Sequence, residues 1–422
     1  MGYFLCLACA KIMLMNIVVG IIIGVFMLML LVIGHEFGHF LMARKNGVEV
    51  EEFGIGFPPR IICWRRVDGK WRVLKRSEWE KMPGKGIVLS VNLLPIGGFC
   101  QMKGENAADK RKGTFGAARF LNKTKILFGG VLANWLIAIV VFTVLALAGM
   151  PQFLDNQFKV DSDSRIVVLQ PVEIVSVESD SPAAKAGLKE GDVIEELRVI
   201  CEDVCERRTV KVNEVKDLLS FDTENAGKEI MISYKRDGNN MLSTVKLNSI
   251  DDEYLLGAGI SGNAVYRSTW SAPIVGVGTT LQITGETFKG IGELVVKLVS
   301  GAIQSISPNE TTRESGAEAL TEAKDSVSGP VGIIGMLFPA FAQSGVRNTM
   351  FLVGLISVSL ACMNVLPIPA LDGGRWLLIL VFKLRKAELT KELEEKIVGR
   401  AFAVILILAL LITVLDIVRI VK

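Results

Sequence analysis

Residues 12–45 read IMLMNIVVGIIIGVFMLMLLVIGHEFGHFLMARK, a long apolar run that closes on a polar motif and two basic residues. The run from Ile12 to Gly34 exceeds the ~20 residues that a helix needs to cross the hydrocarbon core of a bilayer. His35 and His39 are the chain's only two histidines, and they stand four residues apart around Glu36. On a helix, positions i and i+4 share a face, so both imidazoles can reach one metal ion with Glu36 beside it. The stretch predicts a spanning helix with a zinc-hydrolase motif; the plain alternative is a polar turn that ends an apolar helix.

The composition agrees with a membrane protein. Half of the 422 residues are hydrophobic, and the mean hydropathy is +0.43, which is too apolar for an ordinary soluble protein of this length. We therefore expect an α-helical integral membrane protein with four transmembrane helices. They are predicted at residues 12–43, 126–150, 349–382 and 401–418.

The charges are segregated along the chain. Residues 43–125 hold 18 Lys or Arg and 8 Asp or Glu, a net charge of +10, whereas residues 150–346 hold 18 and 29, a net charge of −11. Basic loops stay in the cytoplasm, so we expect residues 44–125 to be cytoplasmic and the acidic region to lie outside. Arg419 and Lys422 fall on the wrong side in this topology. The interpretation is a multi-pass protein of the cell's inner membrane, with its first segment retained, the zinc motif near the cytoplasmic face and no nucleic-acid partner.

A catalytic zinc usually takes three protein ligands, so the two histidines need a partner. Asp372 lies in the stretch NVLPIPALDGGR, residues 364–375, between apolar sequences on both sides. A carboxylate within a spanning segment is costly unless it is paired or metal-bound, and the prolines and glycines predict a break in the helix there. Asp372 is the predicted third ligand. Two alternatives stay open: Asp372 could instead pair with Arg375, and Asp416 is a weaker competitor near the chain end.

These motifs resemble those of the site-2 protease family of intramembrane zinc metalloproteases, most closely its bacterial regulator of sigma-E protease branch. The resemblance rests on the paired histidines, on Leu371-Asp372-Gly373 and on four segments with an external domain. Weaker matches extend along nearly the whole chain. They are Gly54–Phe57, Leu94–Phe99, Gly130 with Asn134, and Gly329–Ile333.

The expected chemistry is metal-assisted peptide hydrolysis. Zinc on His35, His39 and Asp372 would activate a water molecule, and Glu36 would accept its proton and pass it to the leaving amine. Asn364 and Asn134 are expected to orient substrate or to donate a hydrogen bond to the developing oxyanion. The resemblance implies that the substrates are single-span membrane proteins already shortened outside the bilayer, such as anti-sigma factors, or remnant signal peptides.

The acidic external region predicts one compact domain over residues 170–249. A strand from Val172 to Val177, a short helix stopped by Gly187 and a later hairpin around Asp237-Gly238-Asn239 resemble a PDZ domain. PDZ domains bind an extended peptide at a sheet edge, so a peptide or a substrate ectodomain is the expected partner there. A rigid plug without a free binding site is the alternative. Relatives in the matching branch often carry two such domains in tandem, whereas this chain has room for one.

The remaining segments give weaker signals. Short alternating strands are predicted at residues 60–66, 71–75 and 87–91, followed by a turn at Gly97 and Gly98. The resemblance implies that this β region dips toward the active site and presents an edge to extended substrate, whereas a plain hairpin is the alternative. Residues 272–303 predict amphipathic helices lying in the lipid interface, and residues 305–325 predict a polar loop.

Three rival interpretations of the whole chain stay open. One is a membrane zinc protease with a glutamate as third ligand. The second is a catalytically inactive relative that binds membrane proteins through its PDZ domain, which the intact Glu36 argues against. The third is a zinc carrier, for which two histidines are too few to line a transport path. Cys201 and Cys205 could form a disulfide, although their spacing suits a helix face equally well.

Overall fold

The computed structural model describes residues 2–67, 70–74, 76, 86–105, 109–154, 156–200, 209–250, 252, 254–327 and 329–421. The chain divides into two compact units, and each is described by itself. The helical unit comprises Met1–Val144 and Pro273–Lys422, and the sheet unit comprises Leu145–Ala272. Cys201 and Cys205, and with them the predicted disulfide, lie outside the described residues.

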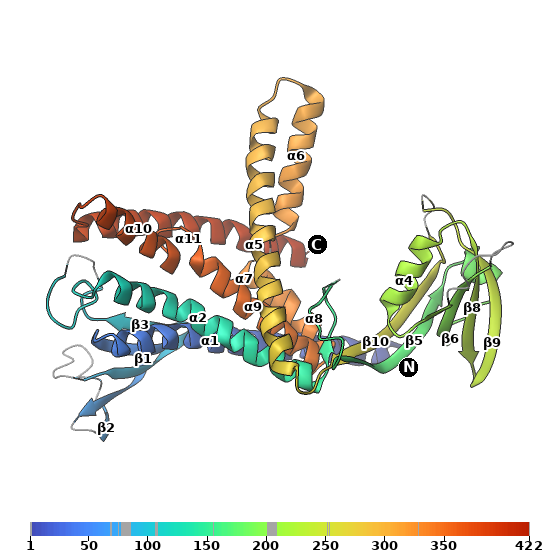
Figure 1. Ribbon diagram of the computed structural model, residues 1–422, viewed down its shortest axis with the longest axis horizontal. Helices are drawn as coiled ribbons and strands as arrows, with labels where there is room; N and C mark the ends of the chain where they lie inside the picture. Colours follow the sequence, from blue (N-terminus) through green and yellow to red (C-terminus); the bar gives the residue numbers. More distant parts are fainter. Residues whose placement is uncertain are drawn as a thin grey trace. The chain divides into compact units, whose positions relative to one another are not determined.

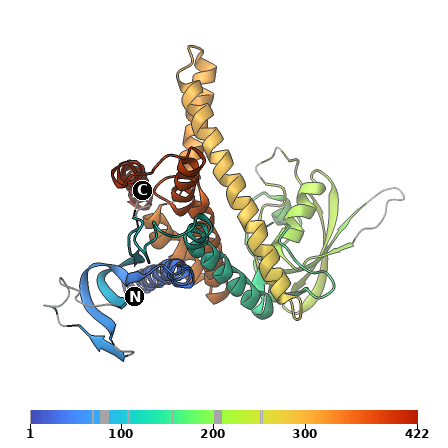
Figure 2. The ribbon, with the colours of Figure 1, turned by 60° about the vertical axis from the view of Figure 1, so that its left-hand side comes forward.

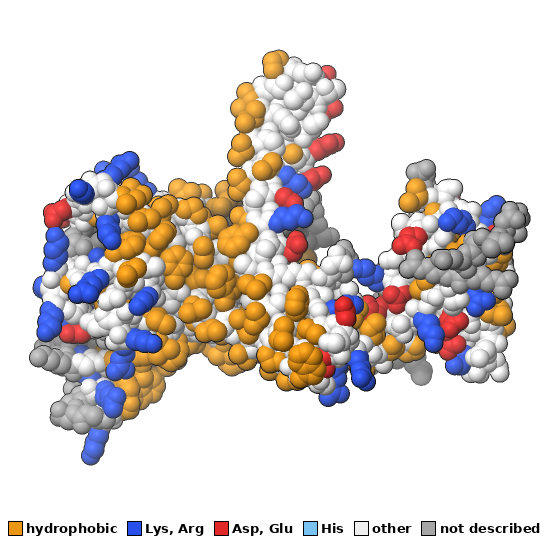
Figure 3. All heavy atoms as spheres, in the orientation of Figure 1, with side chains coloured by type: hydrophobic (Ala, Val, Ile, Leu, Met, Phe, Trp, Pro, Cys, Tyr) orange, Lys and Arg blue, Asp and Glu red, His pale blue; other side chains and the backbone are white. Residues whose placement is uncertain are grey.

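Within the described residues of the helical unit, four helices are long and apolar enough to cross a membrane (Figure 1). Hydrophobic side chains cover the flanks of these helices, while Lys and Arg gather at the end that carries the strands of residues 50–102 (Figure 3). Each of the four predicted segments falls on one of them. They are α1 (Gly2–Lys45), α2 (Phe120–Ala148), α9 (Val346–Val365) and α11 (Lys391–Val421), with candidate spans at Met15–Lys45, Phe120–Ala148, Val346–Val365 and Lys391–Val418.

Glycines let α1 and α2 cross at close range. A Cβ atom at Gly129 would lie 2.7 Å from the carbonyl oxygen of Gly38, and a Cβ atom at Gly38 would overlap the carbonyl of Gly129. Small residues of this kind allow helix backbones to approach each other within a membrane. The crossing lies at the HEFGH motif, so it brings α2 directly against the histidine face of α1.

The predicted third segment is not one helix. Helix α9 ends at Val365, and α10 (Asp372–Leu384) begins only after a six-residue break. Pro367 and Pro369 lack the N–H that a continuous helix requires, which is the physical reason for the interruption. A side chain at Gly373 would overlap the carbonyl of Val365, so the chain folds back tightly on itself. The break was predicted, but the single span over residues 349–382 was wrong.

A small antiparallel sheet packs against α1, in the order β2-β1-β3 (Figure 2). Strands β1 and β3 both bend back, so Phe53 of β1 pairs with Cys100 on one side and Leu89 on the other. The second arm of β3, residues 98–102, therefore forms an outer edge of the described sheet. All three predicted strands lie in this sheet. Its strands are β1 (Val50–Val67), β2 (Lys70–Val73) and β3 (Val88–Met102).

Residues 272–305, where amphipathic helices were predicted, form one continuous helix, α5 (Ala272–Ser305). One face of its first half packs against α2: a Cβ atom at Gly276 would lie 2.8 Å from the carbonyl oxygen of Ile139, and Thr280 and Ile283 are both only 2% exposed. Apolar side chains on the other face, such as Ile274 and Leu281, are exposed. A position of this helix in the lipid interface stays a prediction.

The predicted loop after α5 was wrong, because residues 310–325 form helix α6 (Glu310–Asp325). Asn309 caps its first turn by accepting a hydrogen bond from the N–H of Thr311 at 3.2 Å. Gly301 and Gly316 let α5 and α6 approach closely, so the two helices form an antiparallel hairpin. Hydropathy missed this helix because capping and helix pairing stabilise it, whereas an apolar stripe of its own does not.

The helical unit also holds a short irregular helical segment. Its parts are α7 (Pro330–Gly332), the π-helix η2 (Ile333–Leu337) and α8 (Phe338–Gln343). Phe338 of this segment is fully buried against α1, where Gly24 leaves it room.

The described strands of the sheet unit form one sheet whose neighbours all pair antiparallel, with helix α4 (Val215–Glu224) packed beside it. The expected strand, short helix, turn and hairpin are all present, and Gly187 has a φ of 73° after the short helix. The predicted boundary at residue 249 was too early, because β10 (Ala258–Arg267) returns to pair with β5. A glycine-rich segment gives little strand signal by itself, so this pairing is a tertiary result. The other elements are β4 (Met150–Pro151), β5 (Arg165–Val177), α3 (Pro182–Lys185), β6 (Val193–Val199), β7 (Thr209–Lys211), β8 (Glu229–Arg236) and β9 (Asn239–Lys246).

Candidate metal centre

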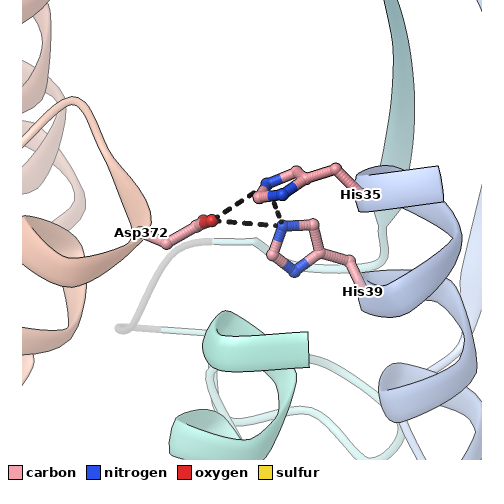
Figure 4. Close-up of side chains that lie close together, drawn as sticks. All are labelled: His35, His39 and Asp372. Atoms are coloured by element: carbon pink, nitrogen blue, oxygen red, sulfur yellow. Dashed lines mark hydrogen bonds and ion pairs between the residues drawn. The ribbon is translucent and has the colours of Figure 1, made fainter. Parts of the chain in front are cut away.

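Three side chains from two distant helices converge in the helical unit (Figure 4). His35 and His39 project from one face of α1, and Asp372 is the first residue of α10. Oδ2 of Asp372 lies 3.1 Å from Nε2 of His35 and 3.3 Å from Nε2 of His39, and the two Nε2 atoms are 3.1 Å apart. The predicted trio is therefore a single cluster.

The dimensions of the cluster fit zinc. Ligand atoms ~2.0–2.1 Å from a tetrahedral zinc ion lie about 3.3–3.4 Å from one another, close to the three separations observed here. The histidines are 8% and 7% exposed, so their nitrogens are withdrawn from bulk solvent. A Cβ atom at Gly130 of α2 would lie 2.6 Å from Nε2 of His39, so only glycine leaves this space open. The donor set and the cleared space could both serve a bound metal ion.

Helix α2 also holds the outer nitrogens of the two imidazoles. Nδ1 of His39 donates a hydrogen bond to the carbonyl oxygen of Ile126 at 2.8 Å. Nδ1 of His35 lies 3.4 Å from the side-chain amide of Asn134. Partners of this kind orient a ligating histidine and select the tautomer that presents Nε2 to the metal.

The proposed alternative partner of Asp372 is engaged elsewhere. The Nε of Arg375 donates to Oε1 of Glu394 at 3.3 Å, and its other end donates to the carbonyl oxygen of Glu105. Glu394 is only 3% exposed, so this is a buried contact between α10 and α11. Arg375 thus anchors the start of α10 and leaves Asp372 to the histidines. Glu394 was missed in the sequence, because nothing in its local pattern separates it from the neighbouring acidic residues of α11.

Asp416 has a different structural role. It is 1% exposed, and its Oδ2 accepts hydrogen bonds from the N–H groups of Gly329 at 3.0 Å and Gly332 at 2.8 Å. It therefore binds backbone at the start of α7 and is not part of the histidine cluster.

Glu36 lies beside the outer edge of the small sheet. A Cβ atom at Gly98 would be 3.9 Å from Cγ of Glu36, and Gly97 has a φ of 85°, which only glycine adopts readily. Cys100 follows on the same edge, and burial raises the pKa of its thiol to about 12, with a further contribution from the nearby charge of Glu36. The thiol therefore stays protonated at neutral pH. At Gly97 and Gly98 the edge carries no side chain, so backbone alone faces Glu36 there.

The other predicted substrate-binding residues are placed less directly. The side-chain amide of Asn364 donates to the carbonyl oxygen of Leu360 within α9 at 2.9 Å. Asn134 meets His35 and is fully buried. Substrate contact by either asparagine stays a prediction.

Comparisons with known proteins agree with the geometry. The family model "Peptidase family M50" matches residues 23–75 and 79–409 of the chain. The chain is 24% identical over 473 residues to the regulator of sigma-W protease RasP of Bacillus subtilis, covering 92% of this chain and 96% of that one. It is 23% identical over 470 residues to the zinc metalloprotease RasP of Shouchella clausii, again with 92% and 96% covered. The PDZ domain of an SdrC-like protein from Listeria monocytogenes aligns at 26% identity with a TM-score of 0.18, covering 23% of this chain and 90% of that domain.

Proposed function

Because this chain belongs to peptidase family M50, we propose that it is a membrane-embedded zinc endopeptidase that hydrolyses peptide bonds in or near the spanning segments of other membrane proteins. The convergence of His35, His39 and Asp372 carries the proposal, since their donor atoms are spaced as zinc ligands. The four long apolar helices support a multi-pass location in the cell's inner membrane. The basic segment 43–125 supports a cytoplasmic position for the sheet β1–β3.

The metal would be held by His35, His39 and Asp372, with Gly130 leaving the space for it. When bound, zinc supplies a Lewis acid that activates water and polarises the scissile carbonyl. Glu36 takes one proton from the attacking water as the carbon–oxygen bond forms, and it then transfers this proton to the amide nitrogen, which leaves as the carbon–nitrogen bond breaks. Its place next to His35 in the helix puts the carboxylate beside the reacting groups.

The sheet edge explains how a spanning substrate would be held. A helical substrate keeps its carbonyl groups in internal hydrogen bonds, so hydrolysis requires a locally extended chain. Residues 98–102 form an outer edge of the described sheet, and Gly98 on that edge lies against Glu36. A substrate strand added there would be held through its main chain, which tolerates many side chains. Single-span proteins already shortened outside the bilayer, such as anti-sigma factors, or remnant signal peptides are the proposed substrates.

The sheet unit is proposed to bind a peptide or the ectodomain of the substrate. Strand β10 pairs with β5 along its length but with β4 only at Val265 and Tyr266, so its first half keeps one edge without a strand partner among the described residues. Helix α4 packs beside this strand. An edge next to a helix is the arrangement to which PDZ-type domains add an extended peptide.

Two substitutions test the activity. Glu36→Gln is expected to retain zinc but to lower cleavage of a model single-span substrate by about 10²–10⁴-fold, because it removes only proton transfer. Asp372→Asn is expected to lose zinc and cleavage together. Metal analysis and cleavage in detergent would measure both effects, and Glu293→Gln, which alters an exposed carboxylate of α5, is the matched control.

Two outcomes would contradict the proposal. One is an active wild-type chain that contains no transition metal. The other is full cleavage by the Glu36→Gln variant. Zinc retained by Asp372→Asn would favour the rival protease with a glutamate ligand, and zinc bound without any cleavage by the wild type would favour the inactive relative.

A further inference from the structure

One stripe of α2 faces the metal centre. Ile126, Gly130 and Asn134 follow one another at four-residue steps, so they lie along a single face of the helix. Their contacts with the histidines differ: the carbonyl oxygen of Ile126 accepts from His39, Gly130 leaves the metal space open, and the amide of Asn134 meets His35. Of these contacts, only the one between Asn134 and His35 still lacks an assigned donor and acceptor.

The tautomer of His35 decides what Asn134 must do. Nε2 of His35 points at the shared metal position, so a neutral, ligating imidazole carries its proton on Nδ1. That N–H group needs an acceptor. Nδ2 of Asn134 lies 3.4 Å away and is itself a donor, while Oδ1 of the same fully buried side chain has no hydrogen-bond partner among the described residues.

Exchanging the oxygen and nitrogen of the Asn134 amide removes this contact between two hydrogen-bond donors. The oxygen and nitrogen of an asparagine amide occupy nearly the same volume, so the chemistry of the neighbour determines which end faces it. With Oδ1 toward His35, a contact between two donors becomes a hydrogen bond. The NH₂ group then takes the place of the unpaired oxygen, so the number of unpaired buried ends does not rise.

We propose that Asn134 is a positioning residue whose side-chain carbonyl accepts a hydrogen bond from Nδ1–H of His35 and so holds the imidazole with Nε2 toward zinc. This inference rests on the proposed zinc site and assigns Asn134 to a metal ligand rather than to substrate. It also gives the two histidines matching supports from one helix, a backbone carbonyl for His39 and a side-chain carbonyl for His35.

The surroundings of Asn134 are suited to this role. The hydroxyl of Ser357 in α9 donates to the backbone carbonyl oxygen of Asn134 at 2.8 Å, and Ser357 is fully buried. The close crossing at Gly38 and Gly129 holds α1 against α2 nearby. A support of this kind keeps the position of a ligating histidine, and its loss typically weakens metal binding about 10–100-fold.

Two nearly isosteric substitutions separate positioning from simple packing. Asn134→Asp keeps an oxygen acceptor and is expected to bind zinc within a few-fold of the wild type. Asn134→Leu removes every acceptor and is expected to lower zinc affinity by about 10–100-fold. A purely structural role predicts the reverse order, because a buried charge disturbs a packed helix interface more than a leucine does. Leu132→Ala, at an exposed position of α2, is the control.

The measurement is zinc affinity of the full chain in detergent, by competition with a chelator of known affinity. The visible spectrum of the cobalt-substituted protein reports ligand geometry, and it should change in Asn134→Leu but not in Asn134→Asp. Wild-type affinity in Asn134→Leu, or equal losses in both variants, would overturn the inference. Failure of the wild type to bind zinc would instead overturn the proposed function, so the two failures are distinguishable.

Discussion

The two units of this protein are assembled in opposite ways. The sheet unit is built from one continuous stretch, Leu145–Ala272, and its hairpin β8–β9 pairs residues separated by a two-residue turn. The proposed metal centre of the helical unit joins His35 to Asp372, which are 337 residues apart. The sheet unit can therefore form from contacts within one continuous segment. The residues of the proposed metal centre, in contrast, come together only once α1, α2 and α10 are packed against one another.

Because of this difference, we expect substitutions in the two units to affect different properties, zinc binding in one and local stability in the other. A change at the metal centre should alter zinc binding without disturbing the sheet unit, because none of its groups contributes to the sheet's core. A change in the sheet unit should alter local stability and leave the metal in place. Three substitutions test this separation, in decreasing order of expected effect.

Gly130→Ala should be the most severe. The added methyl group would lie 2.6 Å from Nε2 of His39 and would occupy the metal position, while alanine itself favours a helix. We expect zinc affinity to fall by more than about 100-fold, beyond the loss of a mere supporting contact. Chelator competition would measure the affinity, and hydrogen exchange of residues 145–272 should stay as in the wild type. Tight zinc binding by this variant would show that the cleared space is not the metal position.

Glu394→Gln should have an intermediate effect. The substitution weakens the anchor on Arg375, which places the start of α10 and with it Asp372. Zinc affinity should fall about tenfold, at the lower end of the range for supporting contacts. Glu392→Gln, an exposed position in the same first turn of α11, is the matched control. Equal zinc affinity in both variants would remove Glu394 from the support of the centre.

Asp192→Asn should have the smallest effect, confined to the sheet unit. Burial raises the pKa of Asp192, but hydrogen bonds from Arg236 and from the N–H of Lys189 outweigh it, so the pKa is lowered overall. A carboxylate with a lowered pKa stabilises the fold at neutral pH, and this stabilisation is lost as the pH falls through its folded pKa. The variant should therefore exchange amide hydrogens faster in β6 and β8 at pH 7, and the difference from the wild type should disappear in acid.

Zinc content gives the second half of that test. It should be unchanged in Asp192→Asn at pH 7, because the metal centre lies in the other unit. Asp237→Asn, in the β8–β9 turn with a φ of 50°, is the control, since asparagine accepts this backbone conformation readily. A difference between Asp192→Asn and the wild type that persists in acid below the folded pKa of Asp192, or loss of zinc, would contradict the separation of the two units.

The resemblance to site-2 proteases is confirmed by the family match, and the relatives named RasP agree with the regulator-protease branch. The presence of four long apolar helices was also predicted, because hydropathy is a local property, but the third predicted segment, residues 349–382, spans both α9 and α10. Helix α6 and strand β10 were not predicted, since a polar capped helix and a glycine-rich strand depend on partners distant in the chain.

The amino-acid sequence by itself determined which groups could bind a metal: two histidines at helical spacing, and one aspartate within an apolar stretch. Residue type and the spacing of residues along a helix can both be read directly from the sequence. Only the tertiary structure decided that Asp372 meets the histidines while Arg375 turns to Glu394, and that α2 offers Ile126 and Asn134 to the imidazoles. These contacts depend on where the helices cross in space. The position of a crossing is set by how the surfaces of two helices pack against each other, which the sequence of either helix alone does not specify.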